Sequence, residues 1–252
     1  MHNEVTYLAY SKSSKEVLKT ATLFKNLSIN AFITGPSGSG KSLLAQYMQS
    51  DAVVADASDI DELLSLTERS DKIIIENFDK ITKYSALDFS NKKVIGISSK
   101  KIDEKIIDKF FGITIELQPL SNREEDILPI AEKFLQQAKE VLMYDEEIIL
   151  NIQKLDISQN CHSLKKSVFF QLLQDEITEN EILSLMEAYL EKRMEGNNIY
   201  REFLYLYELP LITTGLRRYK SQLKLSDALG LNRNTLRKKV NELDIKVSSD
   251  DD

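Results

Sequence analysis

Apolar runs of strand length recur through the first half of the chain, and segments with helical periodicity lie between them. Five such runs are rich in β-branched or aromatic residues, at 31–34, 52–55, 72–76, 93–99 and 113–117. The run at 72–76 is continuously apolar between its ends, as expected for a strand buried on both faces. Helical patterns precede or separate the first three runs, at 13–26 with Ser13 or Ser14 as cap, at 43–48 and at 59–66. This alternation predicts a parallel five-stranded sheet with helices on both sides.

Beyond Pro119 the pattern becomes almost entirely helical. Apolar residues recur at helical spacing for four turns, at 127, 130, 131, 134, 135, 138, 141 and 142. Shorter helices are predicted at about 145–154 and 162–174, which would complete a small all-helical domain. A polar break at 175–180 precedes a helix at about 180–194, and the last block, 199–247, is helical again.

Composition places the chain among ordinary soluble proteins. It has 252 residues, 29% of them charged, and a formal net charge of −7. No run of eighteen apolar residues is present, and the N-terminus lacks the basic start and apolar core of a signal peptide. Cys161 is the only cysteine, which excludes an intramolecular disulfide, and His2 and His162 are too few for a metal cluster. We therefore expect a cytoplasmic protein that does not enter the membrane.

The overall acidity hides a basic C-terminal block. Residues 211–247 contain nine Lys or Arg and only three acidic residues. A basic block at the end of an acidic chain indicates that this part meets nucleic acid. A solvated charged helix would have the same composition, so charge alone does not separate the two interpretations.

A glycine-rich segment follows the first predicted strand and precedes a helix. Residues 35–42 match G-x-x-x-x-G-K-[ST] at every fixed position, and the strand–loop–helix context is that of a phosphate-binding loop. Lys41 would reach the β- and γ-phosphates, and the Ser42 hydroxyl would ligate Mg²⁺. A glycine-rich turn that matches by chance is the alternative. We predict ATP or ADP with Mg²⁺ at a site formed by Gly35, Pro36, Ser37, Gly38, Ser39, Gly40, Lys41 and Ser42.

The third strand ends in residues that bear on hydrolysis. Glu76 occupies the position that holds Mg²⁺ through water, although a purely structural role is the alternative. Asn77 occupies the position of the catalytic carboxylate, and an amide can orient water but cannot take its proton. Asp79 could substitute, but we expect it to point elsewhere. At the tip of the fourth strand, Ser98 and Ser99 are either a sensor of the γ-phosphate or an ordinary strand end.

Residues 221–243 have the pattern of a helix-turn-helix. The first helix runs from Gln222 to Leu229, Gly230 and Leu231 make the turn, and the second helix runs from about Asn232 to Leu243. Leu236, Val240 and Leu243 would bury one face of the second helix. The candidate DNA-binding residues are Asn232, Arg233, Asn234, Thr235, Arg237 and Lys238. Arg can pair with guanine, Asn with adenine and Lys with phosphate, so this helix fits the major groove; a basic surface helix without a DNA partner is the alternative.

Several segments together resemble a known family. Besides the phosphate loop, residues 94–100 resemble a sensor I strand, with Ser98-Ser99 in place of Thr-Asn, and 117–127 resemble a Leu-Pro-Pro-Leu…Arg-x-Glu-Asp-Ile segment. Residues 160–165 resemble a sensor II stretch in which His162 replaces the arginine. Residues 13–175 therefore look like the AAA+ domain of bacterial enhancer-binding proteins, the nitrogen regulatory protein C family. The resemblance implies an AAA+ sheet with a helical lid, and nucleotide contacts from Ser99 and His162.

The C-terminal block resembles the Fis-type DNA-binding domain that ends the same family. The likeness is carried by 229–240 and by Leu209-Pro210-Leu211-Ile212. It implies binding to double-stranded DNA as a homodimer or higher oligomer, with the helices before the motif as the dimer contact. Together the patterns and the resemblance predict an AAA+ α/β subdomain at 1–119, a helical lid at 120–178, a linker helix at 179–198 and the all-α Fis-type domain at 199–252.

Departures from the family shape the functional prediction. Only thirty-three residues separate Ser42 from Glu76, which leaves no room for the loop that engages sigma-54 in the family. No arginine lies between Lys100 and Arg123 to act as an arginine finger, and we expect no receiver domain before the ATPase part. We predict a DNA-binding transcriptional regulator with an ATP-binding AAA+ module of weak or absent hydrolysis. The alternatives are an active AAA+ ATPase acting on sigma-54 RNA polymerase, and a replication-initiator-like AAA+ factor.

Overall fold

The computed structural model describes residues 5–174 and 177–245. The chain forms two compact units, residues 1–177 and 178–252, and each is described by itself. Among the described helices, none combines the length and the apolar character needed to cross a bilayer.

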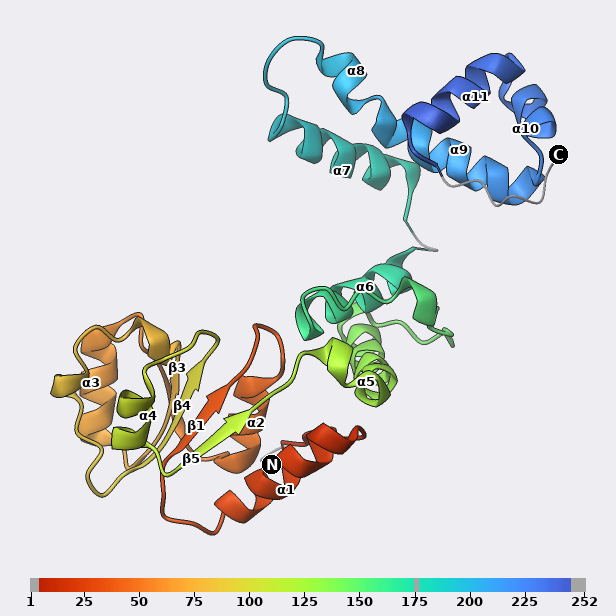
Figure 1. Ribbon diagram of the computed structural model, residues 1–252. Helices are drawn as coiled ribbons and strands as arrows, with labels where there is room; N and C mark the ends of the chain where they lie inside the picture. The colour runs from red at the N-terminus through yellow and green to blue at the C-terminus, as the bar shows by residue number, and fades with distance from the viewer. Residues whose placement is uncertain (1–4, 175–176, 246–252) are drawn as a thin grey trace. The chain divides into compact units, whose positions relative to one another are not determined.

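The first unit is built on a five-stranded, all-parallel sheet, which confirms the predicted fold class (Figure 1). Its strands are β1 (Ala31–Thr34), β2 (Val53–Asp56), β3 (Lys72–Glu76), β4 (Lys93–Ser98) and β5 (Ile113–Glu116), in the order β2-β3-β4-β1-β5. Because all strands are parallel, their carboxyl ends meet at one edge. The loop after β1 therefore lies at the same edge as the ends of β3 and β4.

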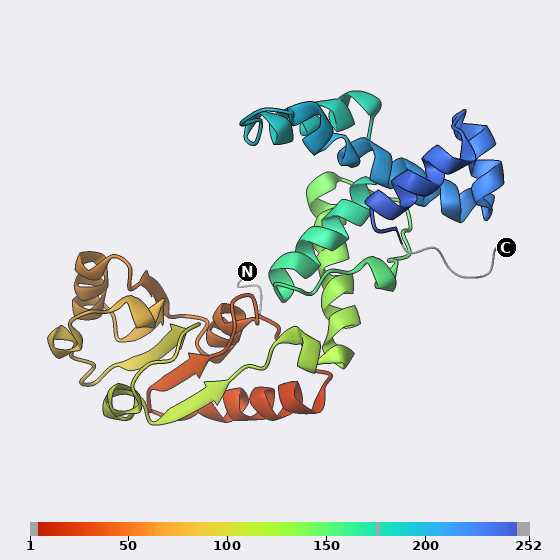
Figure 2. The same cartoon turned by 45° about the horizontal axis from the view of Figure 1, so that its top comes forward.

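Helices cover both faces of the sheet, as the alternating pattern predicts (Figures 1 and 2). Helices α1 (Lys12–Phe24) and α2 (Lys41–Met48) pack on one face, where Ile74 and Ile95 point. Helices α3 (Ile60–Arg69) and α4 (Glu104–Phe110) pack on the other, where Ile73 and Ile75 point. Alternate residues of one strand thus enter different cores, which explains the continuous apolar run of β3.

A small helical lid follows the sheet. It consists of α5 (Glu124–Leu142) and α6 (Cys161–Leu173), with short 3₁₀ turns at η3 (Leu120–Asn122) and η4 (Ile152–Lys154). Leu120, Ala131, Leu164 and Val168 form its own buried core. Two further 3₁₀ turns, η1 (Phe78–Lys80) and η2 (Tyr84–Ala86), follow β3.

Two local predictions were wrong. Helix α1 starts at Lys12 with Ser11 as its N-cap, whereas Ser14 is buried and donates its hydroxyl to Asp126. The helix predicted at 145–154 is replaced by irregular chain and the single turn η4. Near the end of this segment, the Gln171 side chain accepts from the Asn151 N–H at 2.8 Å and donates to the Asn151 carbonyl at 3.1 Å. Those backbone groups are then unavailable to a helix.

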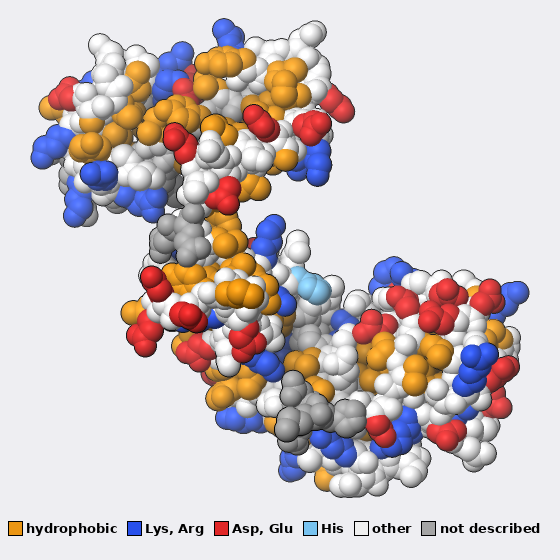
Figure 3. Space-filling model, turned by 180° about the vertical axis from the view of Figure 1, so that it is seen from behind, with side chains coloured by type: hydrophobic (Ala, Val, Ile, Leu, Met, Phe, Trp, Pro, Cys, Tyr) orange, Lys and Arg blue, Asp and Glu red, His pale blue; other side chains and the backbone are white. Residues whose placement is uncertain are grey.

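The second unit is all-helical. It contains α7 (Glu179–Glu191), α8 (Ile199–Phe203), α9 (Tyr205–Tyr219), α10 (Gln222–Leu229) and α11 (Arg233–Glu242). Ile212, Leu225, Leu236 and Val240 form its core. Helix α7 begins with a capping box between Thr178 and Glu181 but buries no residue, and several of its apolar side chains are exposed. On the face seen in Figure 3, hydrophobic side chains gather in several patches among the charged side chains.

Candidate functional site

The loop between β1 and α2 has a backbone that requires glycine. Gly35, Gly38 and Gly40 all have positive φ, at 146°, 73° and 98°. A Cβ on Gly35 would clash with the Leu117 carbonyl, and one on Gly38 would lie 2.6 Å from the Gln159 carbonyl. Gly40 caps α2 without a side chain, so the first N–H groups of this helix face the loop without a side-chain partner. These features give the loop the form of an anion cradle.

Lys41 lies inside this cradle. Its Nζ donates to the carbonyls of Gly35 at 2.9 Å and Pro36 at 2.7 Å, and the residue is buried. Burial lowers the pKa of its ammonium group, while the charges of Asp79 and Glu76 act in the opposite direction. A buried cation beside open backbone N–H groups attracts a phosphate.

The structure brings most of the predicted nucleotide residues to one cavity of about 400 Å³. Its lining comes from the loop, from the ends of β3 and β4, and from the start of α6. The side chains and backbone that line it are Ser37, Gly38, Gly40, Lys41, Ser42, Leu43, Glu76, Asn77, Ile97, Ser98, Ser99, Cys161 and His162. Of the predicted residues, Gly35 and Pro36 instead supply carbonyls to Lys41, and Ser39 lines a neighbouring cavity.

Residues of the lid donate hydrogen bonds to backbone carbonyls of the loop. Asn160 Nδ2 donates to the Ser37 carbonyl at 2.8 Å, and the Cys161 N–H donates to the Gly38 carbonyl at 3.0 Å. Arg123 Nη2 donates to the Ser39 carbonyl at 2.9 Å. Three successive loop carbonyls are thus bound by the lid, which fixes the loop in place.

The second cavity, of about 280 Å³, was not anticipated from the sequence. It is mainly apolar, and it shares Gly40, Leu43 and Cys161 with the first cavity. Its other lining residues are Tyr7, Leu8, Ser39, Arg123, Ile130, Lys133, Phe134 and Gln137. Phe134 was expected only as a core residue of the lid, and nothing in the sequence pattern singled out Tyr7.

A buried ion pair connects the lid to α1 beside this cavity. Arg123 and Asp126 are 2% and 0% exposed, with Nη1 and Oδ2 3.8 Å apart. Asp126 accepts from the N–H groups of Tyr10 at 2.7 Å and Ser11 at 2.8 Å, and from the hydroxyls of Ser11 and Ser14. Burial acts to raise the pKa of Asp126, but these hydrogen bonds bring it below its ordinary value.

The residues expected near a γ-phosphate divide into two groups. Glu76, Asn77 and Ser99 line the cavity of about 400 Å³ that contains Lys41, which we call the phosphate cavity after its predicted ligand. Ser98 lines it too, but this residue is buried, and its hydroxyl contacts the Asp79 carboxylate at 2.9 Å. Asp79 also pairs with Lys100 at 3.8 Å and is not among the lining residues.

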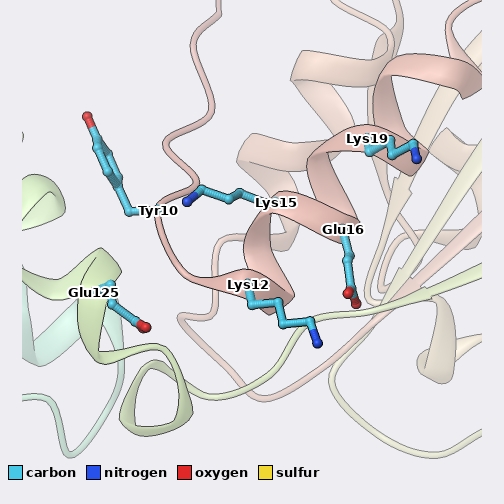
Figure 4. A pocket seen from close by; sticks show the side chains of 6 residues that line it. All are labelled: Tyr10, Lys12, Lys15, Glu16, Lys19 and Glu125. Carbon is cyan, nitrogen blue, oxygen red and sulfur yellow. The ribbon is translucent and has the colours of Figure 1, made fainter.

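A further hollow lies beside α1. Lys12, Lys15 and Lys19 line it together with Tyr10, Glu16 and Glu125. The side chains point in different directions, and the three ammonium groups do not converge (Figure 4). Two carboxylates lie among them, so we assign no ligand to this surface.

Helix α11 presents a polar face to solvent. Asn232 caps it by accepting from the Asn234 N–H at 2.8 Å, while Leu236 and Val240 are buried. All six candidate DNA-binding residues, Asn232, Arg233, Asn234, Thr235, Arg237 and Lys238, are exposed. The next lysine, Lys239, instead forms an ion pair with Glu208 of α9, which links α11 to α9.

The sheet order, the glycine-rich loop after β1 and the helical lid define the AAA+ fold. No protein-family profile matches the sequence. The solved structures with the same fold include NtrX from Brucella abortus in complex with ATP, with a TM-score of 0.57 at 14% identity, covering 95% of this chain and 69% of that one. A second structure of NtrX, in complex with ADP, gives a TM-score of 0.58 at 15% identity, covering 96% and 70%.

Sequence comparison connects the chain to transcriptional regulators. It is 26% identical over 207 residues to the DNA-binding transcriptional regulator NtrC of Rhizobium meliloti, covering 63% of this chain and 43% of NtrC. It is 25% identical over 159 residues to the HTH-type transcriptional regulatory protein TyrR of Haemophilus influenzae, covering 59% and 50%. The chain is therefore homologous to the NtrC and TyrR regulators, and its matches span half or less of their lengths.

Proposed function

We propose that this protein is a DNA-binding transcriptional regulator whose AAA+ unit holds ATP or ADP with Mg²⁺ and hydrolyses ATP slowly or not at all. The observation that carries the proposal is the phosphate cavity, in which the glycine-rich loop, Lys41, Ser42 and Glu76 meet. Homology to NtrC and TyrR, which are transcriptional regulators by name, supports the regulatory part.

The two adjoining cavities fit the two halves of a nucleotide. The polar cavity would take the phosphates against the loop, and the apolar one would take the base between Tyr7 and Phe134. Their shared residues, including Cys161, lie where the ribose would pass. NtrX has the same fold and was crystallised with both ATP and ADP, which supports nucleotide binding here.

Ser42 and Glu76 are the residues that would hold Mg²⁺, the first directly and the second through water. Within residues 5–174 and 177–245, no three His, Cys, Asp or Glu side chains cluster as a preformed metal site. The phosphates must then supply part of the coordination, which is the usual way that proteins bind Mg²⁺. When bound, Mg²⁺ would offset phosphate charge that Lys41 alone does not neutralise.

The slow hydrolysis follows from what lines the phosphate cavity. Asn77 lines this cavity at the position that the family resemblance gives to the catalytic carboxylate, and an amide cannot accept the proton of an attacking water. Arg123, the arginine nearest the loop, is buried and bonded to Ser39, so it cannot act as an arginine finger. His162 lies against Gly38 and would face the phosphates from the lid.

The second unit supplies the DNA contacts of the proposed regulator. Helices α10 and α11 would act as a Fis-type helix-turn-helix, with α11 in the major groove of double-stranded DNA. A homodimer or higher oligomer in the cytoplasm would present two such helices to a two-fold-related site, about one turn of DNA apart. The exposed apolar side chains of α7 and α9 support self-association of this unit.

Calorimetric titration with Mg-ATP and Mg-ADP tests nucleotide binding. We expect both to bind, and Lys41→Ala to weaken ATP binding by about 10- to 100-fold, because it removes a charge-assisted contact to phosphate. Lys12→Ala, which removes an equal charge from exposed α1, is the matched control and should leave affinity unchanged. Equal affinities of the wild-type protein and Lys41→Ala would refute the phosphate site.

A further inference from the structure

The side-chain amide of Asn77 is hydrogen-bonded to Asp56, a residue that does not line the phosphate cavity. Asn77 follows β3 and has a left-handed backbone with φ of 53°. Its Nδ2 donates to both carboxylate oxygens of Asp56, each at 3.0 Å. Asp56 ends the neighbouring strand β2, where its partner in the parallel register is Glu76. Asn77 lines the cavity, whereas Asp56 is not among the lining residues.

The Asp56 carboxylate is itself fixed and charged. Its Oδ1 accepts from the Ser58 N–H at 2.8 Å, so the carboxylate has a defined position at the start of the turn. The hydrogen bonds from the Ser58 backbone and from the Asn77 amide lower the pKa of Asp56 to about 2. A contact of this kind needs one donor and one acceptor: two carboxylates would repel each other, and two amides would lose the charge that strengthens the hydrogen bond.

We propose that Asp56 and Asn77 form a carboxylate–amide pair that keeps ATP hydrolysis slow. The carboxylate of the pair is on Asp56 of β2, outside the cavity, and the amide is on Asn77, which lines it. This inference rests on the proposed nucleotide site. In hydrolysis, the oxygen of water forms a bond to the γ-phosphorus while the bond from that phosphorus to the β–γ bridging oxygen breaks. ADP and phosphate leave, and a proton of the water passes to a base. With the amide at position 77, the described cavity offers no such base there, and exchanging the two residues would supply one.

The exchange variant D56N/N77D tests the pair without any nucleotide. It keeps the shape of both side chains and the hydrogen bond between them, with donor and acceptor reversed. We expect N77D and D56N each to lower Tm by several degrees, and the exchange variant to recover most of that loss. D108N, which changes an exposed aspartate of α4, should leave Tm unchanged. Additive losses, with no recovery in the exchange variant, would overturn the pairing.

Nucleotide measurements on the wild-type protein, N77D, D56N and D56N/N77D test the consequence. All should bind Mg-ATP, and D56N/N77D should hydrolyse it at least about tenfold faster than the wild-type protein, since a positioned base contributes on the order of 100-fold or more. N77D alone should be slower than the exchange variant, because Asp56 then repels the new carboxylate. Equal rates for N77D and the exchange variant, or ATP binding by the exchange variant without faster hydrolysis, would overturn the proposal.

The two failures are distinguishable. If the wild-type protein does not bind ATP at all, the proposed nucleotide site is wrong and the inference falls with it, whatever the Tm values show. If ATP binds and Tm recovers but hydrolysis does not rise, the nucleotide site stands and only the assigned role of the pair is wrong.

Discussion

Single buried polar residues connect the parts of the first unit. Asp126 is fully buried, and it receives four hydrogen bonds from the chain around the start of α1. Arg123 beside it donates to the loop carbonyl of Ser39. One pair thus joins α1, the lid and the phosphate loop. A charge buried in this way is stable only while its partners remain in place.

Replacing this carboxylate should show its contribution directly. We expect Asp126→Asn to lower the free energy of unfolding by about 3–5 kcal/mol at pH 7, because Arg123 is left buried without its anionic partner.

The contribution of Asp126 to stability should also depend on pH. The pKa of Asp126 in the folded protein lies below the unfolded value of about 3.9. Its contribution to the free energy of unfolding is therefore complete above that pH and is lost as pH falls through the folded pKa. Urea unfolding at pH 7 and at lower pH measures this. The difference between wild type and variant should shrink below about pH 4, and a constant difference would contradict the assignment.

Cys161 offers a direct probe of the proposed nucleotide site. Burial raises the pKa of its thiol, and the residue lies where the two cavities join. Because it is the only cysteine, labelling by a thiol reagent reports on this position alone. We expect slow labelling at pH 7 that accelerates with rising pH, and about a tenfold slower rate at ATP concentrations ten times the Kd. Lys41→Ala should abolish the protection, and protection that survives in this variant would place the nucleotide elsewhere.

Residue-level prediction of geometry was accurate where a local pattern determines the backbone. The loop from Gly35 to Ser42 could be predicted because glycine spacing and a following helix suffice to form it. Tyr7 and Asp56 could not be predicted, since only the folded chain places Tyr7 in the same cavity as Phe134 and brings Asp56 to Asn77. The sequence left Ser98 open between a sensor role and an ordinary strand end; it lines the cavity, and its hydroxyl donates to Asp79, which no local pattern indicates.

At the scale of elements, α11 carries the proposed DNA contact. Its buried face is fixed by Leu236 and Val240, and its exposed basic face follows from the helical period. We expect Arg233→Ala and Arg237→Ala each to cost about 1–3 kcal/mol of specific DNA binding. Fluorescence anisotropy with a DNA fragment selected by the wild-type protein measures this. Arg69→Ala, an exposed arginine of α3, loses the same charge and should bind as wild type does; unchanged affinity in both α11 variants would refute the groove assignment.

Elements with one dominant local signal were predicted well. Strand β3 and helix α10 have the predicted bounds, Lys72–Glu76 and Gln222–Leu229. The prediction of a helix at 145–154 was wrong, and the distant Gln171 side chain there takes both backbone hydrogen bonds of Asn151. The start of α1 was misplaced because Ser11, Ser13 and Ser14 are all acceptable caps locally, and Asp126 decides among them.

At the scale of the molecule, the two units have separate cores. The sheet and lid cores lie within residues 1–177, and the core of Ile212, Leu225, Leu236 and Val240 lies within 178–252. Units with separate cores can unfold separately. The change from strand–helix alternation to helices alone at Pro119 marks the start of the lid inside the first unit, whereas the boundary between the units lies near the polar break at 175–180. The sequence could not predict the apolar cavity, which forms only where the lid, the loop and residues 7–8 meet.

Calorimetric unfolding of the full chain should therefore show two transitions. Leu164→Ala in the lid core and Leu236→Ala in the C-terminal core should each lower a different transition, by about 2–5 kcal/mol. Mg-ATP should raise only the transition that Leu164→Ala lowers, and the selected DNA fragment only the one that Leu236→Ala lowers. A single transition affected by both variants and both ligands would show that the units unfold as one.

The fate of bound ATP is the most direct test of a unit that holds a nucleotide without readily cleaving it. The purified protein would be incubated with Mg-ATP, separated from free nucleotide, and its bound nucleotide identified by chromatography. We predict that about one ATP per chain is recovered intact, and that Lys41→Ala retains none. Prompt release of ADP and phosphate by the wild-type protein, abolished in Lys41→Ala, would contradict the account.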